Sequence, residues 1–312
     1  MRVLTVTNMY PSAAEPAFGC FVKEQVEDLV ALGVDADVVQ IDGRESSVNY
    51  GRAVGEIRRR TGGRYYDLVH AHYGLTGAVA AVQRQTPVIT TFHGSETGYV
   101  RWQSWVSRVV ARTTVPVFVS AENARAVGIS SPRVIPCGVD TDLFSPVPRE
   151  GARRELGWEP TGRYVLFPGG ASNRRKRHDL FLAAVEEANR DGLGLQPVTL
   201  EGWSRQEAVL VMNAVDVVVM TSDWEGSPMA VREALACSTP VVSVDVGDVR
   251  TVLEGLPGCS SVDRSPVALA RGIAAALEAG RSPLLRERAQ YSSRRAVARR
   301  IVRLYEEVAR TC

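Results

Sequence analysis

The sequence has few cysteines and no long apolar run. Its five cysteines among 312 residues are scattered, odd in number and without CxxC spacing. They therefore imply neither a disulfide framework nor a zinc site, and they favour a reducing compartment. No uninterrupted apolar stretch approaches the ~18–20 residues that a membrane-spanning helix needs, and the opening MRVLTVTNMYP predicts a strand rather than a signal peptide. We expect a cytoplasmic protein.

Neither sign of charge dominates. The chain carries 37 basic and 35 acidic side chains, for a net charge of +2. A nucleic-acid-binding domain would show a strongly basic patch or stripe, so we expect no nucleic-acid partner. The basic residues are almost all arginine, and the only lysines are Lys23 and Lys176. Lysine at position 176 is therefore unusual for this sequence, in which a basic residue is nearly always arginine.

Short β-branched runs alternate with longer helical patterns, such as FVKEQVEDLVALG at 21–33. This alternation predicts parallel sheets covered by helices, an α/β fold. Strands are expected at 3–7, 34–41, 67–72, 87–92, 115–120 and 133–136, and then at 164–168, 195–200, 216–220 and 240–244.

The length exceeds that of one average domain and suggests two. Turn residues and prolines at 138–151 predict a linker. We expect doubly wound, Rossmann-like domains at 1–145 and 146–312. Residues 281–312 read as helical, and the terminal helix at 292–312 could cross back to the first domain. Ligands of open α/β sheets bind at the carboxyl ends of the strands, so two such domains facing each other would form a cleft.

Residues 216–249 read DVVVMTSDWEGSPMAVREALACSTPVVSVDVGDV and place Glu225 and Glu233 eight positions apart, around the start of a helix. A helix N-terminus offers backbone N–H groups and a positive dipole end to an anion. Gly226 allows close backbone approach, and Pro228 suits a first helical turn. By themselves, the two carboxylates would fit a charge at a helix start and a solvated helix residue.

Other segments complete a family pattern in the same order along the chain. They are FGCFVKEQV (18–26), DLVHAHYG (67–74), TFHGSE (91–96), VIPCGVDTDLF (134–144) and FPGGASNRRKRHDL (167–180). Together with 216–249, they resemble retaining glycosyltransferases of family 4, which have the two-Rossmann GT-B fold. The resemblance covers essentially the whole chain and points to a branch near cell-wall (teichuronic) or secondary-metabolite enzymes.

The resemblance implies transfer of a sugar from a nucleoside-diphosphate sugar, in the first place a UDP-sugar, to an acceptor hydroxyl with retention. Glu225, His93 and Lys176 would be catalytic: Glu225 and His93 beside the sugar, and Lys176 on the departing diphosphate. Glu233 would accept hydrogen bonds from the ribose hydroxyls, as an acceptor-only carboxylate can. The remaining donor-binding residues would be Gly19, Arg174, Gly226, Ser227, Pro228, Met229 and Ala230.

Several positions depart from the family pattern. Asn173 stands where the family has an arginine, so its neighbour Arg174 is the candidate for the diphosphate. A single glycine, Gly19 beside Cys20, replaces the usual pair. Met229 occupies a position that is polar in related sequences, so donor specificity could differ here.

Alternative functions stay open. A sugar-nucleotide epimerase of the same fold would need an acid and a base at the sugar, and a non-catalytic nucleotide-sugar-binding scaffold would have lost turnover. His70, His72 and His93 could contribute to a zinc site, but no fourth ligand is evident. The strings Asp35-Ala36-Asp37 and Asp140-Thr141-Asp142 are expected to be structural, so we expect no metal and no cofactor beyond the donor.

The acceptor depends on loops of the first domain and could be a glycan, a lipid-linked intermediate or a small metabolite. The arginine-rich segment 51–64 could make weak peripheral contact with the inner face of a membrane. An arginine-rich helix in solvent is the commoner interpretation of such a segment.

Overall fold

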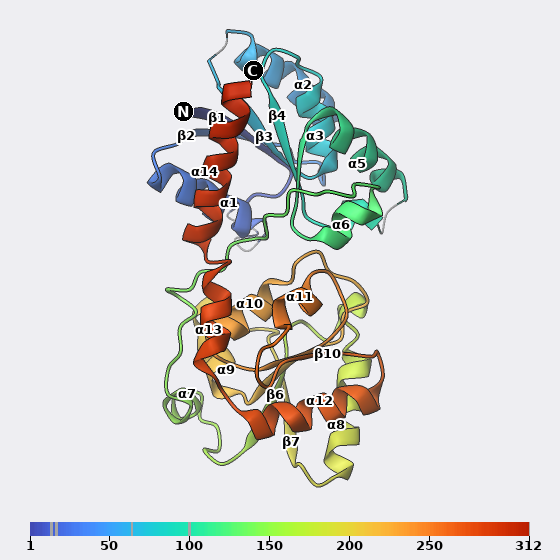
Figure 1. The fold of residues 1–312 in the computed structure, drawn as a ribbon, viewed down its shortest axis with the longest axis vertical. Coiled ribbons are helices and arrows are strands. Elements are labelled where there is room, and N and C mark those ends of the chain that lie inside the picture. The colour runs from blue at the N-terminus through green and yellow to red at the C-terminus, as the bar shows by residue number, and fades with distance from the viewer. Residues whose placement is uncertain (13–14, 16–17, 64, 99–100, 312) are drawn as a thin grey trace. The chain divides into compact units, whose positions relative to one another are not determined.

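The computed structural model describes residues 1–12, 15, 18–63, 65–98 and 101–311 (Figure 1). The chain divides into two compact units. The N-terminal unit comprises residues 1–138 together with the last stretch from Arg294, and the C-terminal unit comprises Val139–Ser293. Each unit is built on a five-stranded parallel sheet, which confirms the predicted α/β class with two Rossmann-like parts.

The sheet of the N-terminal unit has the strand order β2-β1-β3-β4-β5. Its strands are β1 (Arg2–Thr7), β2 (Asp35–Gln40), β3 (Leu68–His72), β4 (Val88–Phe92) and β5 (Val115–Phe118). The helices of this unit are α1 (Cys20–Ala31), α2 (Val48–Thr61), α3 (Gly74–Ala81), α4 (Ser95–Gly98), α5 (Arg101–Thr113), α6 (Ala121–Ala126) and α14 (Arg294–Thr311).

Both faces of this sheet are covered, because successive strand residues point to opposite sides. Val3 of β1 packs with α1 and with Ile301 of α14. Its neighbour Leu4 packs on the other side with Ile57 of α2 and Val79 of α3. The final helix α14 therefore completes the core of the N-terminal unit, although it follows the C-terminal unit in sequence. Cys312, the end of the predicted terminal helix, lies outside the described residues.

The sheet of the C-terminal unit has the order β10-β9-β8-β6-β7. Its strands are β6 (Arg163–Phe167), β7 (Leu195–Thr199), β8 (Val217–Met220), β9 (Val241–Val244) and β10 (Ser260–Val262). The helices of this unit are α7 (Arg149–Glu155), the 3-10 turn η1 (Arg174–Lys176), α8 (His178–Arg190), α9 (Arg205–Ala214), α10 (Met229–Ala236), α11 (Val249–Leu253), α12 (Pro266–Ala279) and α13 (Pro283–Gln290).

One predicted strand is absent, and one observed strand was not predicted. Residues 133–136 do not form a strand; Val134 makes only an isolated bridge to Phe118, in a segment that Pro136 ends by removing a backbone donor. The strand β10 was not predicted, because it is three residues long and begins with two serines. The segment 281–312, which was expected to be helical, contains α13, which ends at Gln290, and α14, which starts at Arg294.

The segment expected to be a linker is anchored to the C-terminal unit. Val139 and Phe144 are 0% and 1% exposed and belong to its hydrophobic core. Helix α7 then begins at Arg149, inside the expected linker. The apolar residues of this segment therefore fix the entry of the chain into the second unit.

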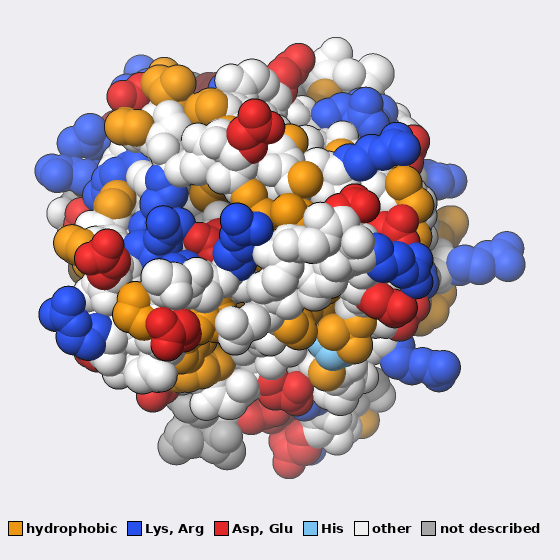
Figure 2. Space-filling model, turned by 90° about the horizontal axis from the view of Figure 1, so that it is seen from below, with side chains coloured by type: hydrophobic (Ala, Val, Ile, Leu, Met, Phe, Trp, Pro, Cys, Tyr) orange, Lys and Arg blue, Asp and Glu red, His pale blue; other side chains and the backbone are white. Residues whose placement is uncertain are grey.

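On the face of the molecule seen from below, basic and acidic side chains are interspersed and form no field of one sign (Figure 2). This distribution agrees with the near-neutral composition of the chain. No helix within the described part of the chain is both long enough and apolar enough to span a membrane.

Candidate functional site

The carboxyl ends of β6 and β8 bring two loops of the C-terminal unit together. The two strands are parallel neighbours, so the segments that follow them emerge at the same edge of the sheet. The hydroxyl of Thr221, just after β8, donates to the carbonyls of Lys176 and Arg177 at 2.9 Å each. The Asp223 amide donates to the carbonyl of Arg175 at 2.8 Å. These bonds join the basic turn to the segment that carries Glu225.

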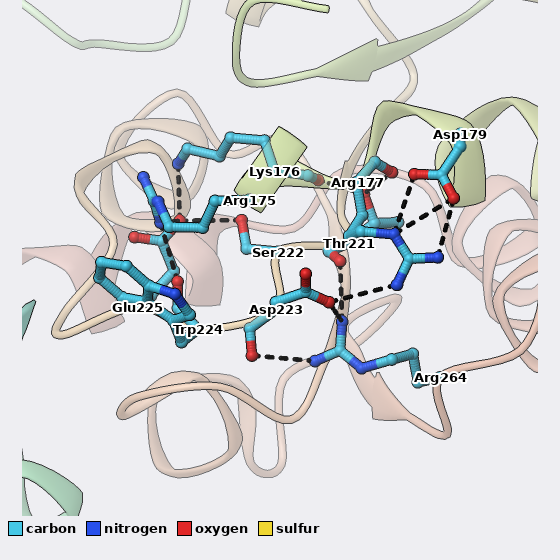
Figure 3. Close-up of polar contacts among 10 residues, drawn as sticks. All are labelled: Arg175, Lys176, Arg177, Asp179, Thr221, Ser222, Asp223, Trp224, Glu225 and Arg264. Atoms are coloured by element: carbon cyan, nitrogen blue, oxygen red, sulfur yellow. Dashed lines mark hydrogen bonds and ion pairs between the residues drawn. The ribbon is translucent and has the colours of Figure 1, made fainter. Parts of the chain in front are cut away.

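The carboxylate of Glu225 is held by two cations (Figure 3). Its Oε1 atom lies 2.6 Å from Lys176 Nζ and 2.8 Å from Arg175 Nη1, and it accepts a hydrogen bond from Ser222 Oγ at 2.8 Å. Glu225 is only 9% exposed. Burial raises the pKa of its carboxyl, but the charges of Lys176 and Arg175 and the hydrogen bonds outweigh burial and lower the pKa below its ordinary value. Glu225 is therefore an anion in a cationic setting.

The sequence made Arg174 the candidate for the diphosphate, which stays a prediction, and did not single out its neighbour Arg175. The structure leaves Arg174 exposed, whereas the Arg175 guanidinium stacks 4.6 Å from the ring centroid of Trp224 and donates to the Trp224 carbonyl at 2.8 Å. Four consecutive basic residues give no indication of which one turns inward. The direction is set by the 3-10 turn η1, which the sequence does not specify.

Two further arginines, Arg177 and Arg264, form ion pairs at the same edge of the sheet. Arg177 Nη1 and Arg264 Nη1 lie 3.2 and 3.3 Å from Asp223 Oδ1, and Arg264 also donates to the Thr221 carbonyl at 3.0 Å. Arg177 has a left-handed backbone, with φ of 56°, which turns the chain from η1 into α8. Figure 3 shows this network beside the Glu225 cluster. Nothing in the sequence pattern had indicated Arg264, which follows the unpredicted β10.

The start of α10 is fixed by the loop before it. Pro228 is the N-cap and has no hydrogen-bonding side chain, so the first-turn N–H groups have no partner within the helix. The Ser227 hydroxyl donates to Asp248 at 3.1 Å, and Asp248 pairs with buried Arg232 of α10. A Cβ atom at Gly247, whose φ is +57°, would lie 2.6 Å from the Gly226 carbonyl oxygen. Glycine at 247 therefore allows the loop before α10 to approach the backbone of residue 247 closely.

The other predicted donor residues of this helix are partly exposed at its start. They are Met229 and Ala230, which also pack against the hydrophobic core, and Glu233, one turn further along α10. Gly226 and Pro228 are buried in the preceding loop. The predicted donor-binding residues of 226–233 thus share one helix start, next to the Glu225 cluster.

Gly19 has a structural role in the N-terminal unit. It is the N-cap of α1 with φ of 72°, and a Cβ atom there would lie 2.3 Å from the Met9 carbonyl carbon. Both the backbone conformation and the close approach require glycine. Contact between Gly19 and a donor phosphate stays a prediction.

His93 belongs to a chain of aromatic and thiol groups at the carboxyl ends of β3 and β4. Its Nε2 lies 3.1 Å from His72 Nδ1, and its Nδ1 lies 3.7 Å from Cys137 Sγ. The ring also contacts Tyr73, with centroids 4.7 Å apart. Burial, and secondarily the nearby His70, lower the pKa of His93 to about 3. His93 is therefore a neutral imidazole, and its two ring nitrogens contact His72 and Cys137.

His70 is committed to structure. Its ring nitrogens lie 2.6 Å from the Tyr305 hydroxyl of α14 and 2.8 Å from the Thr91 hydroxyl. Burial lowers the pKa of His70 to about 3. These contacts engage both ring nitrogens of His70, so neither is directed at a metal site. The described part of the chain holds no group of three or more His, Cys, Asp or Glu side chains placed for a metal.

The two Asp-x-Asp strings have local partners. Asp37 accepts from Tyr66 at 2.8 Å and pairs with Arg2 at 3.0 Å, and Arg2 also lies 3.5 Å from Asp35. Asp140 accepts from the amides of residues 142 and 143 at 3.1 and 2.9 Å. These contacts give both strings a role in local structure.

A buried carboxylate that the sequence did not single out shapes the loop after β4. Glu96 is 3% exposed and accepts from the amides of His93 at 2.7 Å and Gly94 at 3.0 Å. Burial raises the pKa of Glu96 to about 7, against the lowering effect of these hydrogen bonds. Glu96 thus orients the backbone that carries His93.

Two family models match the chain. Residues 21–143 match the model described as Glycosyltransferase Family 4, and residues 162–279 match the one described as Glycosyl transferases group 1. The first covers most of the N-terminal unit, and the second covers the sheet and the Glu225 cluster of the C-terminal unit.

Curated relatives agree with the family. The chain is 26% identical to the putative teichuronic acid biosynthesis glycosyltransferase TuaC of Bacillus subtilis, over 81% of this chain and 83% of that protein. It is 30% identical to a D-inositol 3-phosphate glycosyltransferase of Geodermatophilus obscurus, over 68% of this chain and 60% of that protein. The chain thus spans less than two thirds of the length of that second relative.

Solved structures share the fold. Sucrose-phosphate synthase of Thermosynechococcus elongatus superposes with a TM-score of 0.80 at 18% identity, covering all of both chains. HepE of Anabaena, solved in complex with UDP, superposes with a TM-score of 0.67 at 17% identity, covering 100% of this chain and 99% of the other. The fold, the ordered motifs and the two family matches agree, and the chain belongs to the group 1, or family 4, glycosyltransferases of the GT-B fold.

Proposed function

We propose that the protein transfers a hexosyl group from a nucleoside-diphosphate sugar, a UDP-sugar in the first place, to an acceptor hydroxyl with retention of anomeric configuration. The observation that carries the proposal is the Glu225 cluster, in which Lys176 and Arg175 meet one carboxylate oxygen next to the start of α10. Cations and a helix N-terminus at one sheet edge suit a diphosphate. A carboxylate within that setting suits the hydroxyls of the attached sugar.

In this reaction the bond between the sugar C1 and the diphosphate oxygen breaks, and a bond from C1 to the acceptor oxygen forms on the same face. The acceptor proton passes to the departing diphosphate. The protein then mainly stabilises the negative charge that develops on the leaving group. Lys176 and the N–H groups at the start of α10 are the groups assigned to that charge, and Glu233 is assigned to the ribose.

Glu225 and His93 are assigned to the sugar. The lowered pKa of Glu225 keeps its carboxylate ionised near neutral pH, so it can accept hydrogen bonds and stabilise positive charge on the sugar ring. The neutral His93 ring, whose nitrogens contact His72 and Cys137, would pack beside the sugar without adding a charge that repels positive charge on it. We propose no metal in this chemistry, because Lys176 and the helix start would supply the positive field.

Related structures support this class of donor. HepE of Anabaena has been solved with UDP, with UDP and glucose, and with UDP-glucose. TuaC is a putative teichuronic acid biosynthesis glycosyltransferase, and AviGT4 is a glycosyltransferase involved in avilamycin A biosynthesis. We propose an acceptor hydroxyl on a glycan, a lipid-linked intermediate or a small metabolite.

A donor panel tests the proposal. The wild-type protein and its Glu233→Gln variant are mixed with UDP-, GDP- and dTDP-sugars in the presence of a chelator, and thermal shift and release of free nucleotide are measured. We expect one nucleotide series to stabilise the wild type and to be slowly hydrolysed, with Glu233→Gln weakening binding about tenfold. An isomerised nucleotide sugar would indicate an epimerase, and binding without any turnover would indicate a scaffold; either would contradict transfer.

A further inference from the structure

Helix α5 presents a large apolar stripe to solvent. Trp102, Trp105 and Val109 are 57%, 66% and 44% exposed, and they lie at i, i+3 and i+7, which is one face of a helix. Exposed tryptophans that are adjacent on one face are unusual on a soluble surface, where apolar residues are normally scattered singly. The opposite side of α5 is anchored by buried Ser107, Val110 and Ala111, so the stripe is held outward by the fold.

The stripe leads into an open groove at the amino end of β4. The groove has a volume of about 1030 Å³ and lies between the last turns of α2, α3 and α5. Its lining includes Arg58, Val82, Arg84, Val88 and Val109. Because Val109 belongs to both features, the stripe and the groove form one continuous surface, which we call the α5 face.

The charge on the α5 face has one sign. The sequence of α5 contains three arginines, Arg101, Arg108 and Arg112, and no carboxylate. The groove lining contains Arg58 and Arg84 and likewise no carboxylate. Between described residues, no ion pair involves any of these five arginines, in contrast to the neighbouring Arg60, which pairs with Glu56 at 2.7 Å. Their charges are therefore available to an external anion.

We propose that the α5 face docks the protein on an anionic lipid bilayer surface. Tryptophan places an apolar ring in the interface and keeps a polar N–H near water. Arginines beside it attract anionic headgroups, and such a basic amphipathic helix lies in the plane of the interface. The exposed side of α5 is convex and the groove beside it is open, so a flat bilayer surface can contact both.

This surface differs from the segment 51–64 that the sequence suggested. Of that segment, Arg58 reaches the groove, Arg60 is paired within α2, and Arg64 lies outside the described residues. The tryptophans come from α5 instead. The docking does not depend on the transfer reaction, so its test needs neither donor nor acceptor.

The test is cosedimentation of the full chain with vesicles of phosphatidylcholine, with and without phosphatidylglycerol. We expect binding only to the anionic vesicles, weakened by salt. The double variant Trp102→Ser/Trp105→Ser should lower the partition coefficient at least about tenfold, and Arg58→Gln/Arg84→Gln should lower it by a similar factor. Thermal unfolding of each variant shows whether it is folded.

Two matched controls locate the surface. Tyr291→Ser removes another exposed aromatic, 77% exposed in the C-terminal unit. Arg299→Gln/Arg303→Gln removes two exposed charges from α14, which covers the opposite face of the sheet of the N-terminal unit (Figure 1). We expect both controls to bind like the wild type.

Three results would overturn the proposal. The first is absence of binding to either kind of vesicle, and the second is equal loss of binding in the controls. The third is a dimer, seen by sedimentation velocity, that Trp102→Ser/Trp105→Ser dissociates, because it would assign the α5 face to a second copy of the chain.

Discussion

Lys176→Met is the most informative single substitution for the assigned chemistry. It removes the ammonium that lies 2.6 Å from Glu225 Oε1 but keeps an unbranched apolar stem next to Gly169. The chain contains one other lysine, Lys23 on α1, whose side chain is 50% exposed and lies 3.7 Å from Glu27. Lys23→Met is therefore a control that removes the same chemical group from a solvent-exposed ion pair.

The structure sets two magnitudes for Lys176→Met. Removing one partner of a buried ion pair costs ~3–5 kcal/mol of stability. Here Arg175 and Ser222 remain on the same oxygen of Glu225, so we expect a loss of only about 1–2 kcal/mol. Removing a donor aimed at developing charge lowers turnover about 10²–10³-fold, or ~3–4 kcal/mol. The effect on kcat should therefore exceed the effect on folding.

The assay measures release of free nucleotide from the donor that the panel identifies, with urea unfolding in parallel. We expect Lys176→Met to lower kcat at least about a hundredfold while the donor KM changes by less than about tenfold. Lys23→Met should alter neither. Two results would refute the assignment of Lys176 to the diphosphate. One is unchanged turnover in Lys176→Met, and the other is a loss of turnover that the fraction of unfolded protein accounts for.

Three further outcomes follow from the contacts. Arg175→Gln should lower kcat about tenfold, less than Lys176→Met, because Lys176 still pairs with Glu225. A lower kcat in Arg175→Gln than in Lys176→Met, measured in the same assay, would contradict this order. Gly19→Ala should cost at least about 3 kcal/mol in urea unfolding, because its Cβ would lie 2.3 Å from the Met9 carbonyl carbon. Gly33→Ala, with φ of +88° and nothing within 4 Å, should cost about 1 kcal/mol, and equal losses would contradict the steric argument. For Glu96, the folded pKa of about 7 lies above the reference 4.5. The free energy of unfolding of the wild type, relative to Glu96→Gln, should therefore fall by about 3 kcal/mol as pH rises through that interval. If the difference in stability between the two proteins does not change with pH, the pKa of Glu96 is not raised by folding.

The strands that the sequence predicted well are those with continuous β-branched runs. Residues 216–220 and 240–244 became β8 and β9, whose four residues each are fully buried, since buried parallel strands need apolar side chains on both faces. The strand β10 escaped prediction because Ser260 and Ser261 carry no such signal. Hydrophobic patterning therefore revealed the other edge strands, β2, β5 and β7, but not this short serine-rich one.

The site was predictable as a set of segments but not as a set of contacts. Lys176 and Glu225 are 49 residues apart, and they meet because β6 and β8 are neighbours in the sheet. Strand order depends on packing of the whole unit, which no local pattern specifies. The inward turn of Arg175 and the buried Glu96 depend likewise on the backbone course of short loops, so neither could be distinguished from its polar neighbours in the sequence.

The most direct test of the central claim is the anomeric configuration of the sugar that the enzyme releases. Proton NMR of the wild type with an α-linked UDP-sugar, recorded before the free sugar mutarotates, identifies the first anomer formed in water or on an added acceptor. Retaining transfer predicts the α anomer together with free UDP, at a rate that falls about a hundredfold or more in Lys176→Met. The β anomer, or an epimerised nucleotide sugar without free UDP, would contradict the account.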